Sequence, residues 1–262
     1  MAPTSQPFHY AIARRPAPTF ADGLTSAALG APSLELALAQ HASYVDALER
    51  CGVRVVTLDP DPRYPDSTFV EDTAVIAGGT AVLTRPGASS RRGEVLAIRE
   101  ALGAFFTRIA EIAEPGTVDG GDVCEAGDRI YIGLSERTNE SGAEQLAGML
   151  EEAGFETAFV DIRDLRSILH LKSGLAYLGE DTFVVVAELA ARLMLRGKRI
   201  IQPSAREAYA ANCVRVNDAV LVPEGFPELR RELERAGFAT LPLDVGEYRK
   251  MDGGLSCLSL RF

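Results

Sequence analysis

Two stretches of the chain repeat the same order of predicted elements, and this repeat constrains the fold more than any other feature. One copy runs over residues 124–162 and the other over residues 214–245. Each reads as a strand, a tight turn, a second strand, a helix, the tripeptide Ala-Gly-Phe and a final apolar strand. The turns fall at Gly127-Asp128 and Asn217-Asp218, where residues that tolerate positive φ favour a hairpin. An α/β repeat of this kind predicts units that bury their apolar faces against one another.

Weaker copies extend the repeat to five units. Residues 73–112 and 171–203 follow the same order, and the fifth unit is split between the two ends of the chain. Its helix and last strand fall in residues 34–58, with Ser33 as the expected N-cap and Gly52 as the expected C-cap. The closing sequence GGLSCLSLRF supplies a further strand. We therefore expect one domain over residues 1–262, folded as a closed ring of α/β units, with a plain α/β sandwich as the alternative.

Composition and charge narrow the class of function. The 262 residues carry a net charge of -10, which argues against a nucleic-acid partner and favours a small cationic one. No apolar run reaches the roughly 20 residues of a membrane span, and the N-terminal sequence shows no secretory signal. The four cysteines are widely spread without C-x-x-C or zinc-site spacing, so reduced thiols are expected. These features predict a cytoplasmic, metal-free enzyme.

Acidic residues gather in two short stretches that are otherwise apolar or glycine-rich. PDSTFVED contains Asp66, Glu71 and Asp72, and VDGGD contains Asp119 and Asp122. Carboxylates bind a planar guanidinium through paired, charge-assisted hydrogen bonds. The stretches are compatible with a cation site, and solvated loops remain the alternative for any single residue.

One cysteine and one histidine are candidates for covalent chemistry. Cys257 follows a Gly-Gly pair and is expected on the strand that closes the ring, while His170 lies in SILHLKSG beside a polar turn. A cysteine nucleophile needs an acid or base nearby, and that partner is usually distant in sequence. Isolated cysteines mostly pack as inert small side chains, which is how we interpret Cys51, Cys124 and Cys213. His41, on a predicted helix near its apolar face, is expected to be structural.

Two arginines occupy loops that follow the second strands of their units. These are Arg91 in TRPGASSRRGE and Arg137 in GLSERTN. Surface arginines are usually only solvated. In a ring of repeats, however, equivalent loops converge at one end, where two arginines could hold a carboxylate.

Eight short motifs follow one another along nearly the whole chain. They are DGLTS at 22–26, PDSTFVED at 65–72, TRPGASSRRGE at 84–94, PGTVDGGD at 115–122, GLSERTN at 133–139, LHLKSGLAYL at 169–178, YAANC at 209–213 and YRKMDGGLSCLSLRF at 248–262. Together they resemble the dimethylarginine dimethylaminohydrolases, within the pentein superfamily of guanidino-group-modifying proteins. The resemblance implies a five-bladed α/β propeller, in agreement with the repeat.

The resemblance also implies a role for particular residues. It assigns Cys257 as nucleophile, His170 as general acid/base and Asp119 as acidic partner, a position at which some relatives carry glutamate. It further implies substrate contacts from the acidic residues Asp66, Glu71 and Asp72, from Arg91 and Arg137 at the amino-acid end of the substrate, from Leu24 on a lid loop and from the backbone of Met251.

The activity that the resemblance implies is hydrolysis of methylated arginine to citrulline and a methylated amine. An arginine deiminase would use the same chemistry on unmethylated arginine, but typical members are longer. An amidinotransferase is disfavoured on the same ground, and a non-catalytic binding ring would have no need of the nucleophile. The expected partner is a small-molecule substrate, and exposed surfaces of such rings often pair, which suggests a homodimer.

Overall fold

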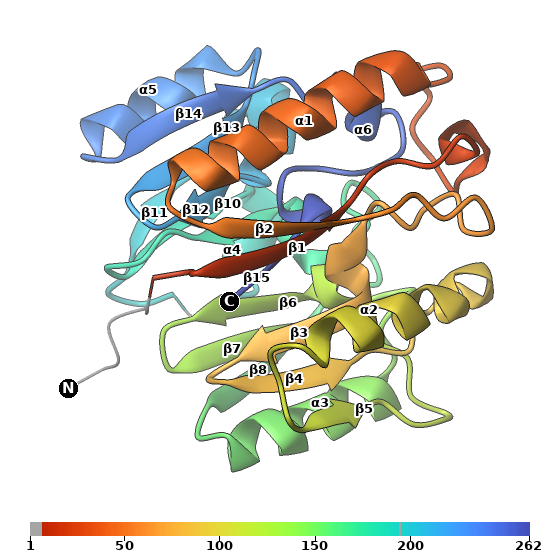
Figure 1. The fold of residues 1–262 in the computed structure, drawn as a ribbon. Helices are drawn as coiled ribbons and strands as arrows, with labels where there is room; N and C mark the ends of the chain where they lie inside the picture. Colours follow the sequence, from red (N-terminus) through yellow and green to blue (C-terminus); the bar gives the residue numbers. More distant parts are fainter. Residues whose placement is uncertain (1–6, 194) are drawn as a thin grey trace.

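The chain forms a ring of five similar α/β units in the computed structural model, which describes residues 7–193 and 195–262 (Figure 1). Each unit holds one three-stranded sheet. In every sheet the middle strand pairs antiparallel with one neighbour and parallel with the other. A helix connects the two parallel strands and lies on the outside of the ring (Figure 1). The predicted five-bladed α/β propeller is confirmed.

The units have the following bounds. The first contains β15 (Leu260–Arg261), β1 (Tyr10–Arg14), α1 (Leu34–Arg50) and β2 (Arg54–Leu58). The second contains β3 (Ala74–Ala77), β4 (Thr80–Leu83), α2 (Val95–Leu102) and β5 (Ile109–Glu111). The third contains β6 (Val123–Ala126), β7 (Arg129–Leu134), α3 (Glu140–Glu152) and β8 (Glu156–Asp161). The fourth contains β9 (Leu175–Tyr177), β10 (Thr182–Val185), α4 (Ala187–Ala190) and β11 (Arg199–Ile201). The fifth contains β12 (Val214–Val216), β13 (Ala219–Pro223), α5 (Pro227–Arg235) and β14 (Ala239–Leu243), and the short α6 (Gly246–Arg249) follows it.

The two ends of the chain meet in the first unit and close the ring. β15 pairs antiparallel with β1, which pairs parallel with β2. The carbonyl of Phe262 also accepts hydrogen bonds from the backbone N–H groups of His9 and Tyr10 at 2.9 and 2.7 Å. The split unit is therefore as predicted, whereas β1, its middle strand, was not anticipated from the sequence.

Local sequence explains how α1 is placed against the closing strand. The Ser33 side chain accepts a hydrogen bond from the Leu36 N–H at 3.4 Å, as predicted for its N-cap. The C-cap is Cys51 rather than the predicted Gly52, which follows it with a φ of 83°, a conformation that costs glycine little. On the buried face, the Tyr44 hydroxyl lies 2.7 Å from Ser259 Oγ. His41 is buried on the same helix, as expected for a structural histidine, and burial lowers its pKa to about 4.

Apolar side chains fill the space between neighbouring units and beneath the outer helices. All four residues of β10 are buried, as expected for a central strand covered on both faces. Near the first unit, Phe20 and Phe69 pack against Tyr248, with ring centroids 5.4 and 6.1 Å from that of the tyrosine. Burial of each such ring stabilises the fold by about 1.5–3 kcal/mol. A Cβ at Gly253 would lie 2.2 Å from the Phe69 ring, so this aromatic cluster packs closely against the segment that leads to Cys257.

A short 3-10 turn precedes the first strand of every unit. These turns are η2 (Val70–Thr73), η4 (Gly120–Asp122), η5 (Leu171–Ser173), η6 (Ala205–Ala211) and η7 (Ser256–Leu258). η2 contacts both η7 and η4, η4 contacts η5, and η5 contacts η6. Cys257 lies in η7, before β15, and the expectation that it sits on the closing strand itself is wrong. The turns, rather than the strands, gather the polar residues of the units at one place.

Candidate active site

One small pocket brings together nearly all of the predicted site residues. Its lining consists of Leu24, Asp66, Phe69, Asp72, Arg91, Asp119, Arg137, Leu169, His170, Met251, Asp252, Gly253 and Cys257. Of the residues predicted to bind substrate or act in catalysis, only Glu71 is missing from this lining. The pocket therefore joins segments that are up to 233 residues apart in the sequence, from Leu24 to Cys257.

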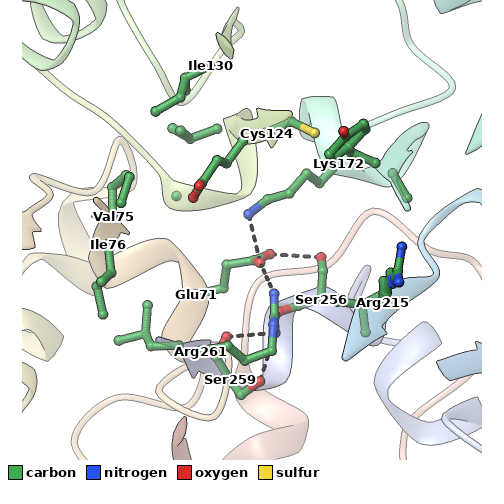
Figure 2. Close-up of a pocket in the computed structure, with 18 of the residues that line it drawn as sticks. Glu71, Val75, Ile76, Cys124, Ile130, Lys172, Arg215, Ser256, Ser259 and Arg261 are labelled. Atoms are coloured by element: carbon green, nitrogen blue, oxygen red, sulfur yellow. Dashed lines mark hydrogen bonds and ion pairs between the residues drawn. The ribbon is translucent and has the colours of Figure 1, made fainter. Parts of the chain in front are cut away.

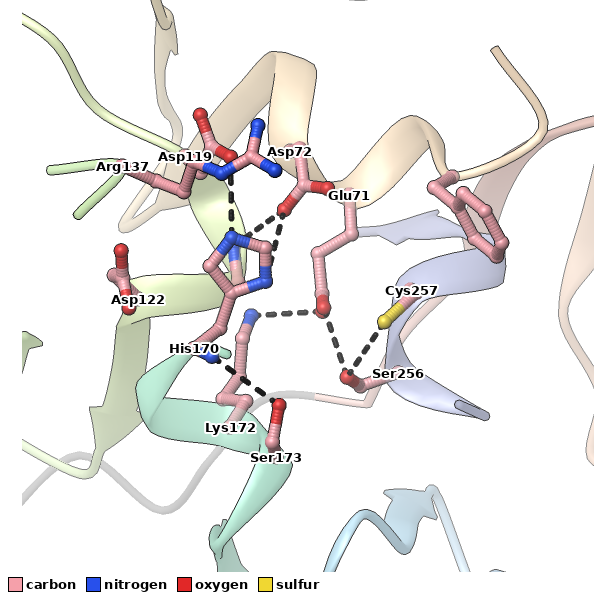
Figure 3. A network of polar contacts seen from close by, with 12 residues as sticks. Glu71, Asp72, Asp119, Asp122, Arg137, His170, Lys172, Ser173, Ser256 and Cys257 are labelled. Atoms are coloured by element: carbon pink, nitrogen blue, oxygen red, sulfur yellow. Dashed lines mark hydrogen bonds and ion pairs between the residues drawn. The ribbon is translucent and has the colours of Figure 1, made fainter. Parts of the chain in front are cut away.

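His170 is held between two carboxylates inside this pocket (Figure 3). Its Nε2 lies 3.1 Å from Asp119 Oδ2, and its Nδ1 lies 4.0 Å from Asp72 Oδ1. Burial by itself lowers the pKa of the imidazole, but Asp72, Asp122 and Asp119 outweigh it and raise the pKa to about 9. His170 is consequently an imidazolium at neutral pH, which is the protonation state of a general acid.

The carboxylates around His170 are themselves fixed by backbone donors. Asp72 Oδ1 accepts from the Gly121 N–H at 3.0 Å, and Asp119 Oδ1 accepts from the Gly87 N–H at 2.8 Å. A Cβ at Gly121 would lie 2.7 Å from His170 Nδ1 and 2.9 Å from Asp72 Oδ1. Gly121, the second glycine of VDGGD, is therefore required by the close approach of the His170 and Asp72 side chains.

Asp122 does not line the pocket, but it hydrogen-bonds to residues that adjoin His170 and Arg137. Its Oδ1 accepts from the Leu171 N–H at 2.9 Å, directly after His170. Its Oδ2 accepts from the hydroxyls of Ser135 and Thr138 at 2.6 and 2.7 Å. This fully buried carboxylate therefore ties η5 to the loop that carries Arg137, which lies between Ser135 and Thr138 in sequence.

The Cys257 thiol lines the same pocket. Burial, and then the charges of Glu71 and Asp72, raise its pKa to about 12. A neutral thiol therefore predominates near pH 7 when the pocket is empty. A bound cation would oppose both carboxylate charges and favour the thiolate, which is the reactive form.

Leu24 and its neighbours cover the pocket as a short loop. The Leu24 N–H donates to both oxygens of Asp66 at 3.1 and 3.2 Å, while 43 % of the residue is exposed. The loop is also tied to the turn after α6, because Thr25 donates to the Lys250 carbonyl and the Ser26 N–H donates to Asp252. Asp252 was not predicted, although its place in the MDGG turn beside Met251 could have suggested it.

Within the part of the chain that the structure describes, Arg137 lines the pocket with an unoccupied guanidinium. It is half-buried and shares the lining with Asp119 and His170 (Figure 3). Among the described residues, no group accepts a hydrogen bond from its guanidinium; the bond made by Arg137 is from its backbone N–H to Ser135. Its donors are therefore available to a ligand.

Arg91 differs from the expectation that it faces the amino-acid end of a substrate. It borders the pocket but is buried, and its guanidinium donates to Glu94 at 2.8–3.2 Å and to Asp72 at 2.6 Å. The Phe69 carbonyl accepts a further hydrogen bond at 3.0 Å. All of its nitrogens are thus engaged, and the arginine orients Asp72 toward His170. Glu94, three residues further along the same motif, was not singled out from the sequence.

Glu71 also differs from the prediction, because its carboxylate points away from the pocket of Cys257. It lies in a second cavity along the middle of the ring, where it meets Lys172 at 2.7 Å and Arg261 at 3.3 Å (Figure 2). Its other oxygen accepts from the Ser256 hydroxyl at 2.8 Å. Neighbouring residues of a tight turn face different ways, which separates Glu71 from Asp72.

Three residues of the pocket could bring ligand atoms to a metal ion. Asp72, Asp119 and His170 each offer one such atom, and these atoms lie within 4.8 Å of one another. The oxygen that Asp119 offers is already 3.1 Å from His170 Nε2, and the Asp72 oxygens accept from Gly121 and Arg91. The arrangement thus has the hydrogen bonding of an ion pair between imidazolium and carboxylates.

Comparison with known proteins places the chain in a family. The family model described as N,N dimethylarginine dimethylhydrolase, eukaryotic, matches residues 31–209. A dimethylarginine dimethylaminohydrolase of Pseudomonas aeruginosa is 44% identical over 97% of this chain and 100% of its own length. The chain belongs to the dimethylarginine dimethylaminohydrolase family. A second member, from Streptomyces coelicolor, is 35% identical over 97% of both chains.

Solved structures of the family share the whole fold. The Pseudomonas aeruginosa dimethylarginine dimethylaminohydrolase, as a cysteine-to-serine variant in complex with citrulline, superposes with a TM-score of 0.95 at 43% identity, covering 98% of this chain and 100% of that one. A dimethylarginine dimethylaminohydrolase adduct with S-methyl-L-thiocitrulline gives a TM-score of 0.94 at 44% identity, covering 97% of this chain and 100% of that one. The N-terminal domain of a cyanobacterial arginine dihydrolase, at 19% identity and a TM-score of 0.86, shares the fold.

Proposed function

We propose that this protein hydrolyses Nω-methylated L-arginine, in particular asymmetric dimethylarginine, to L-citrulline and a methylated amine. The observation that carries the proposal is a pocket lined by carboxylates, a cysteine and a histidine, and also by an arginine with unused donors. These charges match a substrate with a guanidinium at one end and a carboxylate at the other. This chain matches dimethylarginine dimethylaminohydrolases over nearly its whole length, and the activity for which they are named supports the same substrate class.

The pocket orients the substrate by charge. Asp66, Asp72 and Asp119 surround the position next to Cys257, so a planar cation is attracted there and its guanidinium carbon is presented to the sulfur. Arg137 takes the carboxylate at the other end. The loop of Leu24 covers the aliphatic chain of the bound substrate.

Bond formation begins when the bound cation converts the Cys257 thiol to a thiolate, whose proton leaves to solvent. The sulfur attacks the guanidinium carbon, and the two electrons of the C=N bond move to nitrogen in a tetrahedral adduct. His170 then gives its proton to the methylated nitrogen, the C–N bond breaks, and the neutral amine departs. A covalent S-alkylthiouronium remains on Cys257.

The neutral His170 completes the cycle by activating water. It removes a proton from a water molecule as the oxygen attacks the thiouronium carbon, and the C–S bond of the resulting adduct breaks. The hydroxyl proton of that adduct passes to the departing sulfur, so the products are the ureido group of citrulline, the Cys257 thiol and the protonated form of His170. The Asp119 carboxylate, hydrogen-bonded to Nε2, keeps the ring oriented through both steps.

The proposal is tested by measuring citrulline formation from dimethylarginine, monomethylarginine and unmethylated arginine under the same conditions. We expect kcat/KM to be highest for the methylated substrates. Faster turnover of unmethylated arginine would assign the chain to deiminase-like chemistry instead. Colorimetric citrulline detection and amine release measured together would show that the two products form in equal amounts.

The role of Cys257 is tested separately by Cys257→Ser. A serine hydroxyl occupies nearly the same volume but is a far weaker nucleophile at neutral pH, so turnover is expected to vanish while substrate binding by calorimetry is kept. Cys51→Ser is the matched control, because Cys51 lies at the end of α1 and outside the pocket. Near-normal activity of Cys257→Ser would refute the assignment.

Further properties of the protein belong to the same proposal. The site draws on several units of the ring, which supports one catalytic domain over residues 1–262, and every step above uses protein groups without a metal or organic cofactor. The four cysteines are all free, which fits a reducing compartment such as the cytoplasm. In the described part of the chain no helix is long and apolar enough to cross a membrane. A homodimer and the lack of nucleic-acid binding stay predictions, to be checked by analytical ultracentrifugation and gel shift.

A further inference from the structure

A 3-10 turn precedes the first strand of each of the five units, and four of these turns supply or flank residues of the pocket. The fifth contributes no residue to the lining of the pocket. η7 carries Cys257, η2 carries Asp72, Asp119 precedes η4, and His170 precedes η5. The remaining turn, η6, leads into the sequence YAANC at 209–213. That motif is one of those shared with the family, yet none of its residues lines the pocket of Cys257.

Asn212, directly after η6, connects the turn of the nucleophile with the turn of the general acid. Its Oδ1 accepts from the Ser256 N–H at 3.0 Å, and its Nδ2 donates to Ser256 Oγ at 3.0 Å. The same Nδ2 donates to the carbonyl of Lys172 at 2.8 Å. Asn212 is only 5 % exposed, so both donors and the acceptor of its amide serve these three contacts.

Tyr209 makes a parallel contact three residues earlier. Its hydroxyl donates to the Gly253 carbonyl at 2.9 Å. Residues three apart lie on the same side of a 3-10 helix, so Tyr209 and Asn212 hold two points on the segment that leads to Cys257. A Cβ at Gly254 would lie 2.3 Å from Asn212 Oδ1, which explains why this part of the segment is glycine.

These contacts tie together elements from different units of the ring. η5 and η7 belong to the fourth and the first unit, and the strand pairs run only within units. Side chains that bridge the turns therefore help to set the distance between the His170 imidazole and the Cys257 sulfur, and Glu71, which contacts both Lys172 and Ser256, is one of them. Asn212 bridges them directly, because Ser256 adjoins Cys257 and Lys172 is two residues from His170.

We propose that Asn212, assisted by Tyr209, is a positioning residue that holds Cys257 in register with His170 for both proton-transfer steps. The inference rests on the proposed function for its effect on turnover, but its effect on the thiol is independent of any substrate. Displacement of a reacting group by about 1 Å is sufficient to cost ~100-fold in rate. A loss of this contact therefore lowers kcat while KM, set by Arg137 and the carboxylates, changes little.

The test compares Asn212→Ala with Asn217→Ala. Asn217 is a matched control because its amide also makes three hydrogen bonds, to Phe8 N–H, Phe8 carbonyl and Cys51 carbonyl, at 2.8–3.1 Å, and it lies outside the pocket. For each variant we measure Tm, kcat and KM on dimethylarginine, and the rate of Cys257 alkylation by iodoacetamide, followed by mass spectrometry of the peptide that contains it.

Asn212→Ala is expected to lower kcat by about 10- to 100-fold with KM changed less than threefold, and to speed alkylation of the released thiol at least about fivefold. Asn217→Ala should lower Tm by a similar amount without either effect. Equal kcat values for the two variants, with unchanged alkylation, would overturn the proposal.

Should Asn212→Ala fail to fold, Tyr209→Phe removes a single hydroxyl and must change kcat and alkylation in the same directions. If the wild-type protein does not turn over dimethylarginine, the proposed function fails, and the alkylation rates still decide whether Asn212 positions Cys257.

Discussion

Replacement of Asp119 by asparagine probes the electrostatics of the site most directly. The substitution keeps the shape of the side chain but removes the charge whose oxygen lies 3.1 Å from His170 Nε2. The pKa of His170 is raised from 6.5 to about 9 by three carboxylates acting against burial, a preference for the charged form of about 3 kcal/mol. Asp119 is the one of the three that also hydrogen-bonds the ring, so its loss should lower that pKa by about 1–2 units.

The effect on turnover has two parts of unequal size. With the pKa of His170 near 7.5, half of the molecules would still carry the proton at pH 7.5, which accounts for about a twofold loss. The larger part comes from orientation, because an asparagine presents either an amide N–H or a weaker acceptor to Nε2. General acid–base catalysis contributes about 10²- to 10⁴-fold, and we expect kcat of Asp119→Asn to fall within that range.

The assay combines kinetics with NMR. Citrulline formation is measured from pH 5.5 to 9.5, and the imidazole titration is followed directly, which is practical because the chain has only three histidines. Asp59→Asn serves as control, since that carboxylate pairs with Arg15 at the surface. A His170 pKa that stays near 9 in Asp119→Asn, together with kcat within twofold of wild type, would refute the reasoning.

Other substitutions and conditions test separate parts of the site. Arg137→Ala should raise KM by about 10- to 100-fold, the weight of one charge-assisted contact, with kcat changed little; an unchanged KM would remove Arg137 from the carboxylate site. Gly121→Ala should lower kcat at least about tenfold, because its Cβ would displace His170, whereas Gly148→Ala, on the open surface of α3, should raise Tm through better helix propensity. The pKa of His170 is higher in the folded state than unfolded, so the stability it contributes is complete below pH 6.5 and is lost as pH rises through about 9. Chemical denaturation at pH 6 and pH 10 should show a drop that His170→Asn lacks.

The fold was largely predictable because the same order of elements repeats along the sequence. The hairpins at Gly127 and Asn217 have positive φ in the structure, as their sequence indicates, and each precedes the same succession of strand, helix and strand. Among the strands of the described residues, β1 alone was not predicted. Its sequence YAIAR has no turn signal beside it, and its partners β2 and β15 come from opposite ends of the chain.

The site was predictable in its members but not in the direction of every side chain. Glu71 and Asp72 are adjacent acids in one motif, and nothing in that pattern shows that one faces Lys172 and the other His170. Arg91 likewise follows a second strand just as Arg137 does. The burial of Arg91 depends on its ion pair with Glu94, and burial raises the pKa of that carboxyl to about 7. The pair becomes visible only once the turn is folded. Side-chain direction in a turn depends on local backbone angles that residue type alone does not determine.

The charge of the pocket bears on how the reaction ends as well as how it begins. Asp66, Asp72, Asp119 and Asp252 line a cavity in which His170, Arg91 and Arg137 carry the positive charges, so the empty site has one more negative than positive charge, which a cationic guanidinium offsets. Citrulline carries a neutral ureido group in its place, and the attraction that bound the substrate is gone once the amine has left. We therefore expect weak product inhibition, with a citrulline Ki at least about tenfold above the KM for dimethylarginine, since one lost charge-assisted contact is worth about 1.5–3 kcal/mol. Initial rates measured with citrulline at increasing concentration test this directly. A Ki equal to or below the KM would show that binding depends on the carboxylate end and on shape, rather than on the acids that surround Cys257.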